Sequence, residues 1–90
     1  GRVKNILLGM LLKHDSIKND HHKIVLAQDL NSNMYTDLGM TQMDIFEVIF
    51  MIELNSGIEF GDEDFEAIET VDDLIETFSR QPLGELFDDH

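Results

Sequence analysis

Side chains suited to covalent or metal chemistry are few in this sequence. The chain has four histidines and no cysteine, which excludes disulfides, thiolate metal sites and a cysteine nucleophile. It contains neither a Ser-His-Asp pattern nor a glycine-rich phosphate loop, so we expect it not to be an enzyme. The adjacent His21 and His22 point in different directions and no partner cluster follows them, which favours an exposed loop pair over a metal site.

Oxygen-bearing side chains between residues 29 and 40 imitate a calcium-binding loop. They occupy the first, third, fifth and ninth positions of the EF-hand pattern. The sixth position, where that loop needs glycine for its sharp turn, is Met34, and the twelfth, where it needs a bidentate glutamate, is Met40. We therefore expect polar turn residues here, and the sequence predicts no metal site.

The net charge of −13 is unevenly distributed along the chain. The 56 residues between Lys23 and Arg80 hold 14 Asp or Glu residues and no Lys or Arg. Such a surface disfavours nucleic acid as a partner, and it suits either plain solvation or the docking of a protein with a basic patch. No apolar run approaches the roughly 20 residues that span a bilayer. We expect a soluble, cytoplasmic monomer without a membrane span.

Apolar spacing predicts an all-α domain. Residues 2–13 form an amphipathic first helix, because apolar side chains recur there every three or four positions. A long connection follows over residues 15–40, and its apolar segment 24–26 is either a short helix or a turn. The pattern of residues 61–68 predicts a further short helix, capped by Asp62.

Capping residues mark the ends of the central and last helices. Thr41, followed three positions later by Asp44, forms a capping-box pattern that places Gln42 at the first helical position, exposed. Gly57 supplies a left-handed cap at the other end of this central helix. Thr70 begins the last helix with a second capping-box pattern, and Gln81-Pro82 ends it.

Residues 37–44 read Asp-Leu-Gly-Met-Thr-Gln-Met-Asp around the start of the central helix. This motif is similar to the Asp-Leu-Gly-x-Asp-Ser-Leu-Asp signature of acyl and peptidyl carrier proteins. Residues 57–75 also resemble the later family segment I-x-I-P-D-E-x-x-x-x-I-x-T-V-x-D-L, with Gly61 in place of the proline. The resemblance implies an acyl-carrier-protein-like four-helix bundle, three long helices and one short, with a long loop between the first two. Residues 1–82 would form this domain and residues 83–90 a C-terminal tail.

The resemblance places Gln42 at the attachment position for the family's cofactor. In carrier proteins a serine there carries a 4'-phosphopantetheine arm. A carboxamide has no hydroxyl to attack the phosphoanhydride of coenzyme A, so we expect no cofactor. Thr41 also replaces the acidic residue that precedes the family's serine. None of the four serines of this chain follows an Asp-Leu-Gly turn at a helix start; they are Ser16, Ser32, Ser56 and Ser79.

Two functions are compatible with these residues. In the first, the chain is a carrier-protein-like domain of fatty-acid, polyketide or nonribosomal-peptide type biosynthesis that is not loaded and acts as a protein–protein docking or scaffold module. In the second, it is a functional acyl carrier with acyl groups on a phosphopantetheine arm, because Gln42 is an engineered substitution or another serine takes the arm. The sequence favours the first function because no serine stands in a suitable motif.

The resemblance also implies an acidic docking face. Carrier proteins meet synthase and transferase enzymes through their second helix and its neighbourhood. The matching acidic side chains in this sequence would bind a basic patch on such a partner; they are Asp44, Glu47, Glu53, Asp62, Glu63 and Glu66.

Apolar residues on the predicted helices define an expected core. Its members are Leu7, Met10, Leu11, Phe46, Ile49, Phe50, Phe60, Phe65, Ile68, Val71, Leu74 and Phe78. The phenylalanines at positions 46, 50, 60 and 65 should fill the space in which carrier proteins of the fatty-acid type can hold an acyl chain.

Overall fold

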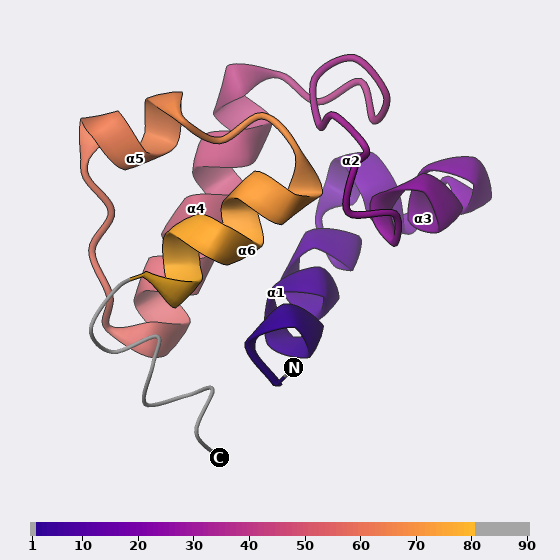
Figure 1. Ribbon diagram of the computed structural model, residues 1–90. Coiled ribbons are helices and arrows are strands. Elements are labelled where there is room, and N and C mark those ends of the chain that lie inside the picture. Colours follow the sequence, from indigo (N-terminus) through magenta and orange to yellow (C-terminus); the bar gives the residue numbers. More distant parts are fainter. Residues whose placement is uncertain (1, 81–90) are drawn as a thin grey trace.

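Helices make up most of residues 2–80, the part of the chain that this computed structural model describes (Figure 1). In chain order they are α1 (Arg2–Leu12), α2 (Asp15–Lys18), α3 (His21–Ala27), α4 (Gln42–Ser56), α5 (Asp62–Glu66) and α6 (Val71–Ser79). No strand forms among these residues, and the expected all-α class is confirmed. The expected stop at Gln81-Pro82 and the tail at residues 83–90 lie outside the described residues.

Four of the other helices pack against α1. This helix contacts α2 and α3, and it also contacts α4 and α6, whereas α5 lies at the edge of the molecule far from α2 and α3 (Figure 1). Leu7 and Leu11 form the buried face of α1, with 1% and 0% of their surfaces exposed. Burial of two leucines at a spacing of four explains why this amphipathic segment is helical.

Two short helices form within the long connection between α1 and α4. The helix α3 includes residues 24–26, so the helical alternative holds for that segment. Asp20 caps α3 by accepting a hydrogen bond from the Lys23 amide at 3.2 Å. Ile17 of α2 and Ala27 of α3 are fully buried, and Ile24 and Leu26 of α3 pack against the core, so both short helices are anchored by apolar contacts.

The rest of this connection is held against the start of α6 by backbone hydrogen bonds. The Met34 amide donates to the Glu69 carbonyl at 2.8 Å, and the Val71 amide donates to the Ser32 carbonyl at 3.0 Å. The Met34 side chain is fully buried. Residues 32–34 therefore occupy a fixed place in the core although they belong to no helix.

The ends of α4 follow the capping residues that the sequence predicts. The Thr41 hydroxyl accepts from the Asp44 amide at 3.1 Å, and the Asp44 carboxylate accepts from the Thr41 amide at 2.9 Å. Gly57 ends the helix with a φ of 75°, a left-handed conformation that favours glycine.

The capping residue predicted for α5 is wrong by one position. Gly61, not Asp62, precedes the helix, and Asp62 is its first helical residue. The reason is that the Asp64 carboxylate accepts a hydrogen bond from the Gly61 amide at 3.1 Å. A side chain within the first turn therefore fixes the start of α5, and the capping residue needs no side chain of its own.

The helix α4 buries a different face from the one that the sequence predicts. Phe46 and Phe50, both expected in the core, are 54% and 53% exposed, and Met43 is 69% exposed. Apolar residues surround most of this helix, so periodicity alone does not identify the face that contacts α1. The buried side chains of α4 are Ile45, Val48, Ile49 and Ile52.

The remaining core prediction holds in large part. Three of the expected residues lie partly buried at the margin of the core; they are Met10, Phe60 and Phe65. Those confirmed as buried are Leu7, Leu11, Ile49, Ile68, Val71, Leu74 and Phe78.

The longest described helix, α4, has 15 residues, and no helix within residues 2–80 has the length and hydropathy to cross a membrane.

Substitutions on opposite sides of α4 test which face is buried. Ile52→Ala should lower the free energy of unfolding by about 2 to 5 kcal/mol, because it leaves a cavity at a fully buried position. Phe50→Ala should lower it by about 1 kcal/mol or less, because the ring stands largely in water. Urea unfolding measures both values. Equal losses for the two variants would place Phe50 in the core and contradict the observed face.

The capping carboxylate of α6 predicts an acid-sensitive contribution to stability. Burial alone would raise the pKa of Asp73, but hydrogen bonds from the Thr70 and Glu69 amides hold that pKa below the usual value for aspartate. This stabilisation is therefore complete above the unfolded-state pKa of about 4 and disappears as the pH falls through the folded-state pKa.

Between pH 5 and pH 2, roughly the range over which such carboxylates titrate, Asp73→Asn should lose less unfolding free energy than the unmodified protein. Urea unfolding at each pH measures this loss. Asp72→Asn removes the same charge from the neighbouring position and serves as the control. An acid profile of Asp73→Asn identical to that of the unmodified protein would show that these hydrogen bonds do not favour the ionised carboxylate over the protonated one.

Candidate functional site

The first turn of α4 presents Gln42 to solvent. The chain reaches this turn through Leu38 and Met40, which are buried, and through Gly39, whose φ is 66°. The Met40 amide donates to the Met34 carbonyl at 2.9 Å. This hydrogen bond joins residues 38–40 to residues 32–34, which are paired with the start of α6. Gln42 is then the first helical residue and is exposed, as predicted.

Beside Gln42, α4 and α5 enclose an open depression of about 310 Å³. Its other lining residues are Met43, Phe46 and Phe65. The rings of Phe46 and Phe65 lie 5.4 Å apart between centroids at an interplanar angle of 59°, an arrangement that favours aromatic pairs. None of the four lining residues carries a hydroxyl group that could act as a nucleophile, and Gln42 contributes only a carboxamide.

An apolar stripe runs along the solvent side of α4. Its four members are each more than half exposed; they are Met43, Phe46, Phe50 and Leu54. At 3.6 residues per turn these positions share one side of the helix, opposite to the buried isoleucines. Exposed apolar side chains that gather on one helix face are uncommon on a monomeric protein.

Acidic side chains border the apolar stripe on both sides. Helical geometry places Asp44 and Glu47 along one border, which we call the first rim. Glu53 lies along the other border, where its carboxylate accepts from the Phe60 amide at 3.0 Å. The helix α5 lies on this side of α4, because its Phe65 contacts Phe46, and we count its exposed acidic residues with the second rim; they are Asp62, Glu63 and Glu66. The six predicted docking residues thus lie in two groups with apolar side chains between them.

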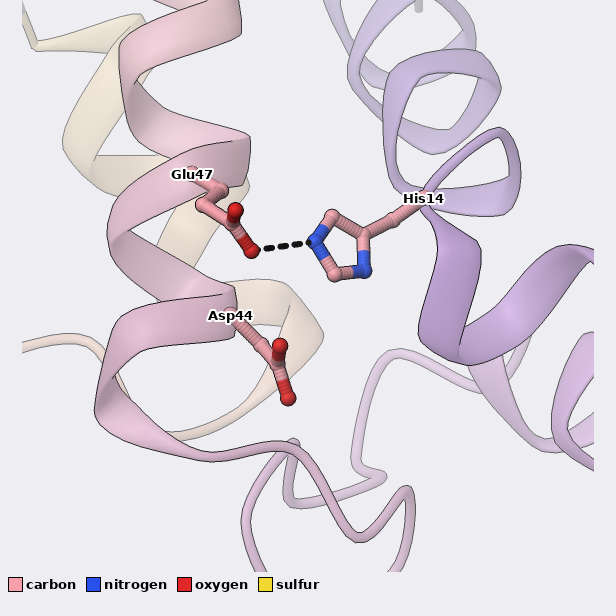
Figure 2. A group of neighbouring side chains, drawn as sticks. All are labelled: His14, Asp44 and Glu47. Atoms are coloured by element: carbon pink, nitrogen blue, oxygen red, sulfur yellow. Dashed lines mark hydrogen bonds and ion pairs between the residues drawn. The ribbon is translucent and has the colours of Figure 1, made fainter.

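The first rim meets a histidine that sequence reasoning did not single out. His14 lies between α1 and α2, and its Nε2 is 3.1 Å from Glu47 Oε1. Figure 2 shows the His14 ring directed from its loop toward α4, with Asp44 one turn away from Glu47 on the same side of the helix. One possible ligand atom from each of His14, Asp44 and Glu47 lies within 4.8 Å of the others.

The hydrogen bonds of His14 define which ring nitrogen carries the hydrogen. Its Nδ1 accepts from the Ser16 amide at 3.1 Å, so this nitrogen caps α2 and is unprotonated. Nε2 therefore carries the hydrogen and donates it to Glu47. The His14 residue is only 8% exposed, whereas the Glu47 carboxylate faces solvent.

The carboxylates of the segment that imitates a calcium-binding loop accept hydrogen bonds from nearby backbone amides. The Asp29 carboxylate accepts from the Asn31 amide, and the Asp37 carboxylate accepts from the Asn33 amide. These are turns in which side-chain oxygens satisfy nearby backbone amides. His21 and His22 are exposed at the start of α3. The His14 contact had no signal in the sequence, because it joins residues 33 positions apart.

Comparison of the chain with models of known protein families finds no matching family.

Proposed function

We propose that this chain is a carrier-protein-like docking module that carries no phosphopantetheine arm and binds a protein partner through α4. The observation that carries the proposal is the apolar stripe between two acidic rims. A chain with a net charge of −13 is solvated well by its charges alone, so plain solvation gives no reason for four exposed apolar side chains on one helix face. Docking explains both the stripe and the rims.

The partner of this surface has a defined chemistry. Its contact region presents apolar side chains framed by Lys and Arg, because the apolar stripe would be covered while the rims pair with cations. An amphipathic basic helix meets these requirements when its apolar face lies along α4. The resemblance to carrier proteins suggests synthase or transferase enzymes as the source of such a surface.

The alternative function, a working acyl carrier, requires an attachment hydroxyl. Gln42 stands where the resemblance places that hydroxyl, and its exposed carboxamide cannot accept the arm. The capping box around it supports a substitution test, because Thr41 and Asp44 fix the turn without help from the side chain at position 42.

Incubation with coenzyme A and a broad-specificity phosphopantetheinyl transferase should leave the intact mass of the unmodified protein unchanged. Gln42→Ser restores the hydroxyl and should gain the mass of one arm. Thr41→Asp in addition should raise the loaded fraction, since aspartate keeps the N-cap and restores the family's acid. Gln28→Ser is the matched control and should stay unloaded. Loading of the unmodified protein would establish the alternative function, and failure of both altered proteins would remove the carrier-like part of the proposal.

A synthetic amphipathic helical peptide of leucine and lysine tests the docking surface in a buffer that contains a metal chelator. The double variant with Phe46→Ala and Phe50→Ala should weaken peptide binding about tenfold or more, because it removes two rings whose apolar area the peptide would cover. Glu47→Lys with Glu63→Lys, one on each rim, should weaken it and reduce its salt dependence.

Two controls separate the surface from net charge. Glu69→Lys with Glu76→Lys makes the same charge change at exposed positions outside the rims and should have a smaller effect. A peptide of the same composition with a scrambled order should bind more weakly than the amphipathic one. The docking surface would be overturned if both charge-reversal variants lost the same peptide affinity and the double alanine variant lost none. Binding would then depend on general charge attraction alone.

A further inference from the structure

His14, Asp44 and Glu47 bring three metal-ligating side chains together from distant parts of the chain. Asp44 and Glu47 are three positions apart on α4, so they project from the same side of the helix. His14 approaches them from the loop between α1 and α2 (Figure 2). Its nearly buried ring is fixed by the capping bond from Ser16, and its Nε2 faces the two carboxylates. The docking surface proposed above does not require this histidine.

The distances suit a small divalent cation. Zinc binds nitrogen and oxygen ligands at about 2.0 to 2.2 Å in a tetrahedron, so its ligand atoms lie roughly 3.3 Å from one another. His14 Nε2 and Glu47 Oε1 are already 3.1 Å apart. The ligand atoms of the group lie within 4.8 Å of one another, and rotation of the exposed Glu47 side chain can bring its carboxylate closer to the other two ligands. The Asp44 oxygen that does not accept from Thr41 is the one that remains for a metal.

We propose that these three side chains form a binding site for a divalent transition metal, with Zn²⁺ as the best match. An imidazole nitrogen among the ligands favours zinc, nickel or cobalt over calcium and magnesium, which prefer oxygen alone. The two carboxylates balance the charge of the dication. Three protein ligands leave a further position for water or for a ligand from outside the chain.

The neighbour of His14 supplies the second hydrogen bond that such a site needs. Metal binding at Nε2 transfers the ring hydrogen to Nδ1, so no net proton is lost from the imidazole. Ser16 Oγ lies 2.8 Å from Nδ1 and would accept that hydrogen. A ligating histidine usually donates its other ring hydrogen to an oxygen in this way. The exchange replaces the capping bond from the Ser16 amide.

The other charged groups around the site leave it accessible. The open depression in front of the cluster has a volume of about 470 Å³ and is also lined by Lys13 and Asp15. Lys13 is exposed, so its ammonium group can stay in water away from a bound cation. Asp15 pairs with Lys18 at 2.9 Å, and this contact lowers the pKa of the Asp15 carboxyl. Neither residue blocks the three ligands.

Calorimetric titration with Zn²⁺ alone tests the proposal on the unmodified chain. One Zn²⁺ should bind, and Ca²⁺ or Mg²⁺ in equal amount should not displace it. Glu47→Gln and His14→Asn should each weaken binding about tenfold or more, because even loss of an outer-sphere partner costs that much. Asparagine is chosen at position 14 because it can still cap α2. Far-UV circular dichroism verifies that both variants keep their helices.

Two controls and one spectroscopic readout identify the site. Glu76→Gln removes an exposed charge elsewhere, and His21→Asn with His22→Asn removes the other described histidines; neither should change Zn²⁺ affinity. Nuclear magnetic resonance of the ring nitrogens should show the His14 hydrogen moving from Nε2 to Nδ1 when Zn²⁺ is added. Equal affinities for Glu47→Gln, His14→Asn and Glu76→Gln would overturn the site, as would Zn²⁺ binding lost with His21 and His22.

Discussion

The pairing of residues 32–34 with the start of α6 is the constraint on which the rest of the structure depends. Backbone hydrogen bonds from Met34 to Glu69 and from Val71 to Ser32 join segments that lie more than 30 positions apart. They fix the connection, and the connection then delivers Met40 and Thr41 to the start of α4. The place at which α4 begins follows from this pairing. A loop without helical structure thus fixes the start of the helix that carries the apolar stripe.

Local signals account for the parts of the fold that could be predicted from the sequence. The caps at Thr41, Gly57 and Thr70 are short-range chemistry, in which a side chain or a glycine satisfies backbone groups within a few positions. Helix ends were therefore accurate where such residues exist. At α5 the sequence does not distinguish Gly61 from Asp62 as the cap, because both residues suit a helix start, and the contact of Asp64 decides between them.

The face of α4 and the histidine cluster depend on long-range packing. Apolar residues surround most of α4, so its sequence is compatible with burial of Phe46 and Phe50 or of Ile45 and Ile52. Contact with α1 selects the second arrangement. His14 gave no sequence signal for the same reason, because nothing near it in the chain indicates Glu47. The sequence predicts the docking acids as a single face, and their division into two rims depends on which side of α4 is buried.

The exposure of Met43 has a consequence for the chemistry of the surface under oxidising conditions. Met43 is 69% exposed, whereas Met34 and Met40 are 0% and 4% exposed. Peroxide reaches exposed sulfur first, and oxidation to the sulfoxide replaces a flexible apolar group with a polar one. The buried pair that holds the connection in place is shielded from this reaction. An oxidant would therefore alter the surface of α4 and leave the interior intact.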